Sequence, residues 1–114
     1  MTGGGNVHRR TIALEGISQN TVHGFAKKYF TSQGFSLKSD TNPGQLVFKR
    51  GSYIGLTLRT ITMYLVVLII SDDSGVDIRC EFYTPGTTLF REDVCMLNAE
   101  IDSFKQSLIQ QEIA

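Results

Sequence analysis

The chain has no tryptophan and only two cysteines, Cys80 and Cys95, among its 114 residues. Small secreted domains that depend on disulfides usually carry roughly four or more cysteines, so this count favours a reduced protein of the cytoplasm, with one bridge as the alternative. Neither sign of charge dominates, because 11 basic residues balance 11 acidic ones. That balance excludes a global field that would attract nucleic acid or an anionic membrane.

Long hydrophobic runs are missing as well. The longest occupies residues 61–70, where Thr62 is the only strongly polar side chain. A membrane-spanning helix needs about 20 apolar residues, so no membrane span is expected. The run is rich in β-branched side chains and ends at the turn-forming stretch 71–75, a pattern typical of a strand buried on both faces.

The amino-terminal residues contain no apolar core of the kind found in signal peptides. The glycines within residues 1–7 predict a flexible tail, and residues 8–114 are expected to form a single α+β domain. A domain of roughly 100 residues can bury a hydrophobic core without metals or disulfides. The sequence contains no internal repeat or low-complexity segment.

The first two expected elements are a strand and a helix. Apolar and polar residues alternate over residues 10–15, which predicts a half-buried strand. Ser18 is placed to cap the amides of the following helix, and Gly34 is placed to end it. Phe35 is then expected to touch Phe30 across that stop. The helix is expected to bury an apolar stripe made of Val22, Phe25, Ala26, Tyr29 and Phe30.

Further strands are predicted in the middle of the chain. Residues 35–40 and 45–50 flank a turn with proline and glycine, which indicates a hairpin. Residues 52–59 are expected to form a further strand, a bulge or a short loop. The run 61–70 follows as a strand, and residues 76–83 alternate between apolar and polar side chains, as in a strand with one face in water.

From about Thr88 the apolar spacing changes to three and four residues, which predicts a long helix. The expected order is β-α-β-β-(β)-β-β-α, a two-layer α+β sandwich in which an antiparallel sheet of roughly five to six strands carries two helices on one face. This order is similar to the β-α-β4-α topology of the TATA-binding-protein-like group of folds, a resemblance that concerns the fold alone. The seam of the last helix consists of Phe90, Val94, Leu97, Ile101, Phe104 and Leu108.

Few residues are candidates for catalysis or metal binding. His8 and His23 have no cysteine or carboxylate at metal-ligand spacing, so both are expected to be solvated surface residues. Cys80 and Cys95 are expected to be small core residues, because a catalytic cysteine requires a neighbouring base. We therefore expect no catalytic residue, no metal, no cofactor and no enzymatic activity.

The densest acidic group is Asp72, Asp73 and Asp77, whose spacing does not match an EF-hand. Aspartate side chains in a hairpin turn normally accept hydrogen bonds from local amides, which is the interpretation we prefer here. Residues 49–54 resemble the basic-glycine-aromatic core of an RNA-recognition-motif strand, but Ser52 stands where an aromatic residue should follow the glycine. One further possibility is a shared basic surface made of Arg9, Arg10, Lys49, Arg50 and Arg59. Basic side chains on exposed strand positions, however, usually only keep the protein soluble or protect the sheet edge.

The run 61–70 is apolar on both faces, and the two expected helices can cover only one of them. Successive side chains of a strand point to opposite sides of the sheet, and two helices on one side cover only one set. The neighbouring strands offer mostly polar residues on the other side. An apolar patch is therefore predicted on the open face, made of Tyr64, Val66, Leu68 and Ile70 and joined by Val47, Tyr53 and Tyr83.

Monomers seldom leave such a patch bare, so the leading hypothesis is a non-enzymatic interaction or oligomerisation module in which a homodimer or another protein covers the patch. The structural alternative is that sheet curvature, the tail or the last helix covers it within one molecule. A carrier of a small apolar ligand held between sheet and helices is the second hypothesis. The third, and less favoured, is single-stranded nucleic-acid binding by Tyr53, Tyr64 and Tyr83 beside Arg50 and Arg79.

Overall fold

The structure is a computed structural model that describes residues 6–51 and 61–113, the last two of these by their backbone alone. Tyr53, Arg59 and the segment 52–59 therefore lie outside the described residues, as do residues 1–5 of the expected tail. No helix within the described ranges is long and apolar enough to cross a membrane.

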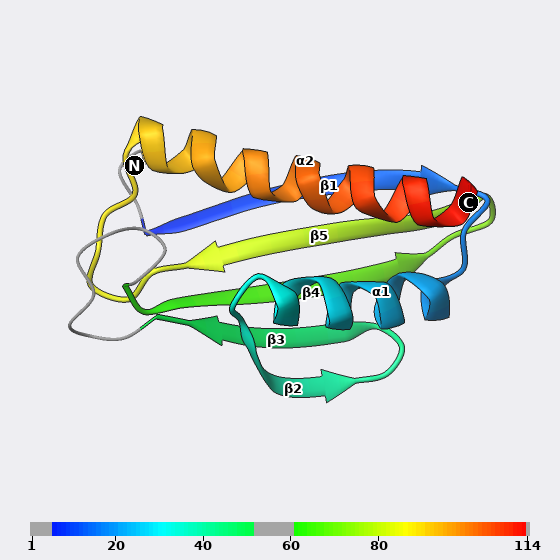
Figure 1. The fold of residues 1–114 in the computed structure, drawn as a ribbon, viewed down its shortest axis with the longest axis horizontal. Helices are drawn as coiled ribbons and strands as arrows, with labels where there is room; N and C mark the ends of the chain where they lie inside the picture. Colours follow the sequence, from blue (N-terminus) through cyan, green and yellow to red (C-terminus); the bar gives the residue numbers. More distant parts are fainter. Residues whose placement is uncertain (1–5, 52–60, 114) are drawn as a thin grey trace.

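The described chain contains five strands and two helices in the order β-α-β-β-β-β-α (Figure 1). All strand pairs are antiparallel, and the strands lie in the order β1-β5-β4-β3-β2. The expected α+β class, antiparallel sheet and order of elements are confirmed. The elements are β1 (Val7–Glu15), α1 (Gln19–Ser32), β2 (Ser36–Thr41), β3 (Gln45–Arg50), β4 (Met63–Ser71), β5 (Gly75–Tyr83) and α2 (Arg91–Ile113).

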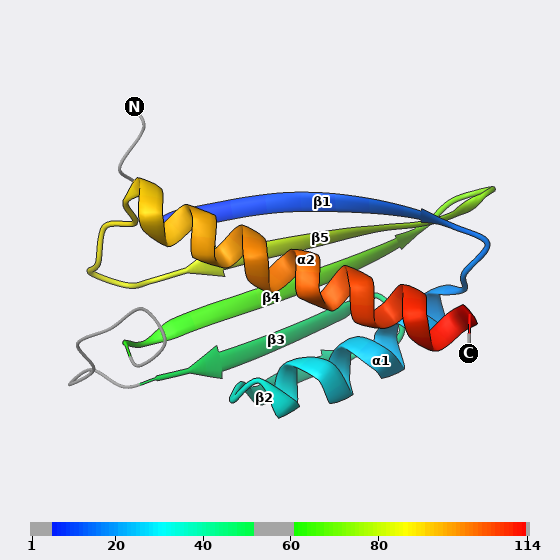
Figure 2. The ribbon, with the colours of Figure 1, turned by 45° about the horizontal axis from the view of Figure 1, so that its top comes forward.

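Both helices lie on the same face of the sheet (Figure 2). α1 contacts β2, β3 and β4, whereas α2 contacts β1 and α1. The core fills the space between this layer and the sheet, and its largest fully buried side chains include Phe30, Phe48, Phe82 and Phe104. Each such apolar side chain contributes about 1.5–3 kcal/mol by leaving water. The core therefore uses one face of the sheet.

Local sequence sets both ends of α1. The Ser18 hydroxyl accepts a hydrogen bond from the amide of Thr21 at 3.1 Å and so caps the first turn. At the other end, Gly34 has a φ of +94°, which a residue without Cβ adopts at little cost. The amide of Phe35 then donates to the carbonyl of Phe30 at 3.1 Å, as in a Schellman motif. The two phenylalanine rings meet edge to face with centroids 5.9 Å apart, which confirms the expected contact.

α2 begins at Arg91, later than the apolar spacing predicted. The amide of Phe90 donates to the Asp93 carboxylate at 2.9 Å, which satisfies a free donor at the start of the helix. The Phe90 side chain is 66% exposed, so its prediction as part of the packed seam is wrong, and Leu89 is buried in its place. The rest of the seam is confirmed, because Val94 is half-buried and the fully buried residues are Leu97, Ile101, Phe104 and Leu108.

Candidate functional site

The two faces of β4 differ in their surroundings. Four alternate residues are at most 2% exposed and belong to the core, namely Met63, Leu65, Val67 and Ile69. Alternate residues starting from Tyr64 lie on the opposite face of the sheet, where neither α1 nor α2 covers them. Of these, Tyr64, Val66 and Leu68 are half-buried by their neighbours in the sheet, and Ile70 is 48% exposed.

Neighbouring strands extend this apolar surface. The strand register places Val47 of β3 beside Val66, and Tyr83 of β5 beside Tyr64. The two tyrosine rings stack with centroids 6.3 Å apart. Val7 of β1 is 46% exposed and lies beside Tyr83. We call the resulting surface the open-face patch, which consists of Val7, Val47, Tyr64, Val66, Leu68, Ile70 and Tyr83.

Six of the seven residues predicted for this patch thus lie on the same face of the sheet, and Tyr53 is outside the described residues. Sequence reasoning missed Val7, because the glycines that precede it favoured a tail up to this residue. β1 in fact begins at Val7, ahead of the expected start of the strand, and pairs there with β5. The only hint in the sequence that the strand starts here was the apolar side chain of Val7 among polar neighbours.

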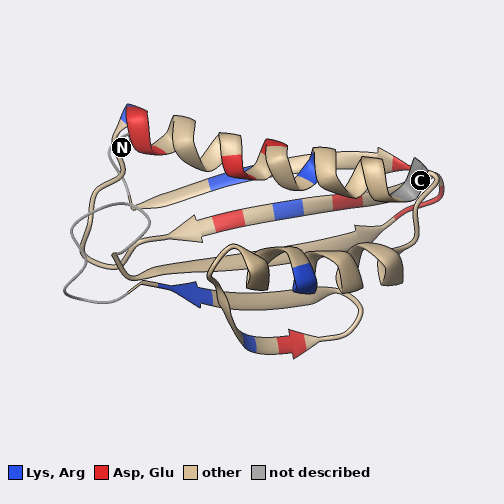
Figure 3. Cartoon of the chain, viewed as in Figure 1, with Lys and Arg blue, Asp and Glu red and all other residues tan. Residues whose placement is uncertain are grey.

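Charged side chains border the patch along β5. Asp77, Arg79 and Glu81 alternate in sign on the open face of that strand, whereas the adjacent β4 carries no charged residue (Figure 3). The Arg9 Nε of β1 donates to the Glu81 carboxylate at 2.6 Å. Arg79 makes no ion pair with any residue that the structure describes. An apolar row with a rim of mixed charge is the usual composition of a protein interface.

Arg50 does not lie on this surface, contrary to the nucleic-acid hypothesis. Its side chain is 5% exposed on the helix side, where it donates to both carboxylate oxygens of Glu100 in α2 at 3.1 and 3.0 Å. The guanidinium also lies 4.3 Å from the centroid of the Phe35 ring. Removing one partner of such a buried pair costs about 3–5 kcal/mol. Arg50 therefore joins β3 to α2. Of the two cations expected in the nucleic-acid hypothesis, only Arg79 lies on the open face.

The basic residues do not share one surface. Arg10 forms an ion pair with Asp102 of α2 at 2.7 Å, on the same side as the helices. Arg9 and Lys49 lie on the open face, but β5 and β4 separate their strands. Arg59 is outside the described residues. The described cations are consequently spread over both faces of the sheet.

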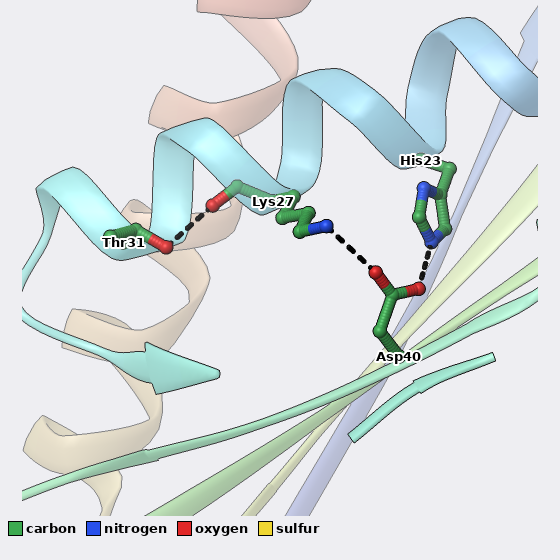
Figure 4. Close-up of polar contacts among 4 residues, drawn as sticks. All are labelled: His23, Lys27, Thr31 and Asp40. Carbon is green, nitrogen blue, oxygen red and sulfur yellow. Dashed lines mark hydrogen bonds and ion pairs between the residues drawn. The ribbon is translucent and has the colours of Figure 1, made fainter. Parts of the chain in front are cut away.

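Both histidines are less exposed than expected, so their prediction as solvated surface residues is wrong. His23 of α1 is 6% exposed, and its Nε2 lies 2.7 Å from Oδ1 of Asp40 in β2. Lys27 donates to the other carboxylate oxygen at 2.8 Å (Figure 4). The hydrogen bonds from Lys27 and then from His23 hold the pKa of Asp40 below its usual value. His8 is half-buried in β1, with its Nε2 2.8 Å from Oδ1 of Asn98 in α2.

The two cysteines have opposite environments and both are free thiols. Cys80 is fully buried in β5 as predicted, and burial raises the pKa of its thiol to about 12 despite the opposing effect of Arg10. Cys95 is exposed on α2, so its prediction as a core residue is wrong. It directly follows Val94 of the seam, and one helical step of about 100° turns it away from the core.

The aspartate-rich segment forms the turn between β4 and β5, as predicted. Asp72 accepts hydrogen bonds from the amides of Ser74 at 2.9 Å and Gly75 at 2.8 Å. These bonds, that from Gly75 first, lower the pKa of Asp72. Among the side chains that the structure describes, in residues 6–51 and 61–111, no group of three or more from His, Cys, Asp or Glu is placed to hold a metal ion.

The elements define a two-layer α+β protein whose antiparallel sheet is covered by helices on one face and open on the other. Comparisons with protein-family models, with curated proteins and with solved structures found no match for this chain. The function is therefore argued from the open-face patch and from the charges beside it.

Proposed function

We propose that the protein is a non-enzymatic interaction module whose binding surface is the open-face patch. The observation that carries this proposal is the burial pattern of β4, in which one face is covered by helices and the other presents an uncharged row of large side chains. Proteins that act as monomers seldom expose a contiguous apolar surface of this kind. A partner that covers the patch would remove it from water.

The polar groups of the molecule support a binding role better than a catalytic one. A catalytic site gathers reactive groups, such as a general base or a nucleophile, so that they face one pocket. Arg50 is instead held by Glu100, and His23 by Asp40. Cys80 is buried with a raised pKa, which suppresses the reactive thiolate. These groups hold elements of the fold together.

The composition of the open face favours a protein as the partner. Its centre is aliphatic and aromatic, and its border carries acidic and basic side chains in alternation. Protein interfaces commonly combine such an apolar centre, enriched in tyrosine, with a polar rim. Acidic groups at Asp77 and Glu81 would repel a polyanion, which makes nucleic acid the poorer fit.

Site-specific photo-crosslinking tests the proposal. The photoreactive residue p-benzoylphenylalanine replaces Val66 in the centre of the patch, in cells that naturally make the protein. After irradiation we expect a covalent adduct of defined mass, because a bound partner lies within reach of this position. Lys28 is exposed on α1, so the same replacement there is the matched control. Equal or absent adduct formation at the two positions would contradict a binding role for the open face.

A further inference from the structure

We infer that the occupant of the open-face patch is a second copy of this chain, packed face to face about a two-fold axis that runs across the strands. The inference rests on the proposed function, because it names the partner of the same surface. Two-fold dimers are the most common assemblies of soluble chains, and they require a surface that is complementary to its own inverted copy. The charges on β5 and the side chains on β4 meet this requirement.

The charges on β5 are complementary when the strand is laid over its own copy. An axis in the plane between the two sheets and perpendicular to the strands places every strand antiparallel over itself. If that axis crosses β5 at Cys80, Arg79 lies over Glu81 of the second copy. Packed sheets are about 10 Å apart, a gap that arginine and glutamate side chains span from opposite sides. Because of the symmetry, this ion pair occurs twice.

The outer positions of β5 fit in the same register. Asp77 then lies over Tyr83 of the second copy, whose hydroxyl is a suitable donor to a carboxylate. In the isolated chain, Arg79 has no ion-pair partner among the described residues. The second copy supplies one, while Glu81 also keeps its existing hydrogen bond from Arg9. No charge on β5 is then opposed by a like charge.

The apolar residues of β4 fit about the same axis. Val67 pairs with Cys80 in the sheet, so the axis crosses β4 at Val67. Val66 then packs over Leu68 of the second copy, and Tyr64 packs over Ile70. Val67 and Cys80 themselves point toward the helices and are fully buried, so no outward side chain on the axis collides with its own copy.

The other simple orientation has poorer charge complementarity. An axis parallel to β4 would lay β5 over β3 of the second copy instead of over itself. The strand register then sets Arg79 opposite Gln45, and Glu81 opposite Val47. A carboxylate that faces an apolar side chain across a dry interface is unfavourable. The distribution of charge therefore selects the axis that runs across the strands.

Charge reversal on β5 tests this arrangement. Arg79→Glu and Glu81→Arg each set like charges against one another twice per dimer. For either variant we expect sedimentation equilibrium to show a dimer weakened by about tenfold or more. In an equimolar mixture, the two glutamates of one chain face the two arginines of the other. We therefore expect native mass spectrometry to show the mixed dimer selectively, with an affinity within about threefold of that of the wild type.

Two further variants complete the experiment. Lys28→Glu makes the same change of charge on the exposed side of α1, and we expect it to leave the dimer unchanged. Val66→Lys should dissociate the dimer while circular dichroism shows a folded chain. If Glu81→Arg does not fold, Arg79→Glu decides the question alone, because Arg79 has no ion pair in the described chain to lose.

The outcomes separate this inference from the proposed function. A wild-type chain that stays monomeric at all concentrations, while photo-crosslinking at position 66 captures a different protein, overturns the inference and leaves the interaction module standing. A dimer that Val66→Lys dissociates but that neither charge variant weakens also overturns the inferred arrangement. Absence of any adduct at position 66 overturns the proposed function and the inference together.

Discussion

Gly75 begins β5 opposite Glu15 of β1, at a point where the two strands approach closely. A Cβ at this position would overlap the backbone carbonyl oxygen of Leu14. Gly75→Ala must therefore push two paired strands apart. We expect the free energy of unfolding, measured in urea, to fall by about 1–3 kcal/mol.

Gly24 provides the matched control for that substitution. It lies exposed within α1, and a Cβ there would have nothing within 4 Å. Alanine has the higher helix propensity, so Gly24→Ala should raise the free energy of unfolding by about 0.5–1 kcal/mol. A Gly75→Ala chain as stable as the Gly24→Ala chain would contradict the close approach of β5 to β1.

At the scale of elements, the edge strand β2 is joined to α1 by the carboxylate of Asp40, which lies between His23 and Lys27. The pKa of Asp40 is lowered in the folded protein, chiefly by the hydrogen bond from Lys27. A carboxylate with a lowered pKa stabilises the fold above its unfolded pKa, near 3.8. That stabilisation disappears as the pH falls through the folded pKa.

Asp40→Asn should therefore reduce the loss of stability on acidification. We expect urea unfolding between about pH 2 and pH 6 to show a weaker pH dependence than in the wild type, together with a lower stability at the upper end of that range. Asp73→Asn makes the same chemical change in the exposed turn between β4 and β5 and is the matched control. An Asp40→Asn profile that follows the wild type would show that this contact does not hold β2.

On the scale of the whole molecule, the helices cover one face of the sheet, so neighbouring positions of β4 should tolerate a charge very differently. Leu65 is fully buried and Leu68 lies on the open face. Leu65→Lys buries an unpaired ammonium, and we expect it to lower the free energy of unfolding by more than about 3 kcal/mol. Leu68→Lys should stay within about 1 kcal/mol of the wild type in dilute solution. Thermal unfolding followed by circular dichroism distinguishes the two, and equal losses would mean that both faces of β4 are core.

Two of the features that the sequence predicted correctly depend on residues close together along the chain. The helix stop at Gly34 and the turn built on Asp72 use hydrogen bonds that reach only a few residues. The errors at Arg50 and His23 concern partners from distant elements. Arg50 and His23 were expected at the surface because nothing near them in sequence reveals Glu100 or Asp40. A single sequence does not specify which helix packs over which strand.

The sequence by itself determined that β4 has two apolar faces, because side-chain alternation in a strand follows from the backbone alone. The polar residues expected on the neighbouring strands indicated which of the two faces stays open. Only the tertiary structure decided which strands each helix covers, since that depends on how α1 and α2 pack against the sheet. It also brought Val7 beside Tyr83 and placed the alternating charges of β5 next to the apolar row of β4. These neighbours come from separate strands, and hydrogen-bond register, which is set by the whole sheet, brings them together.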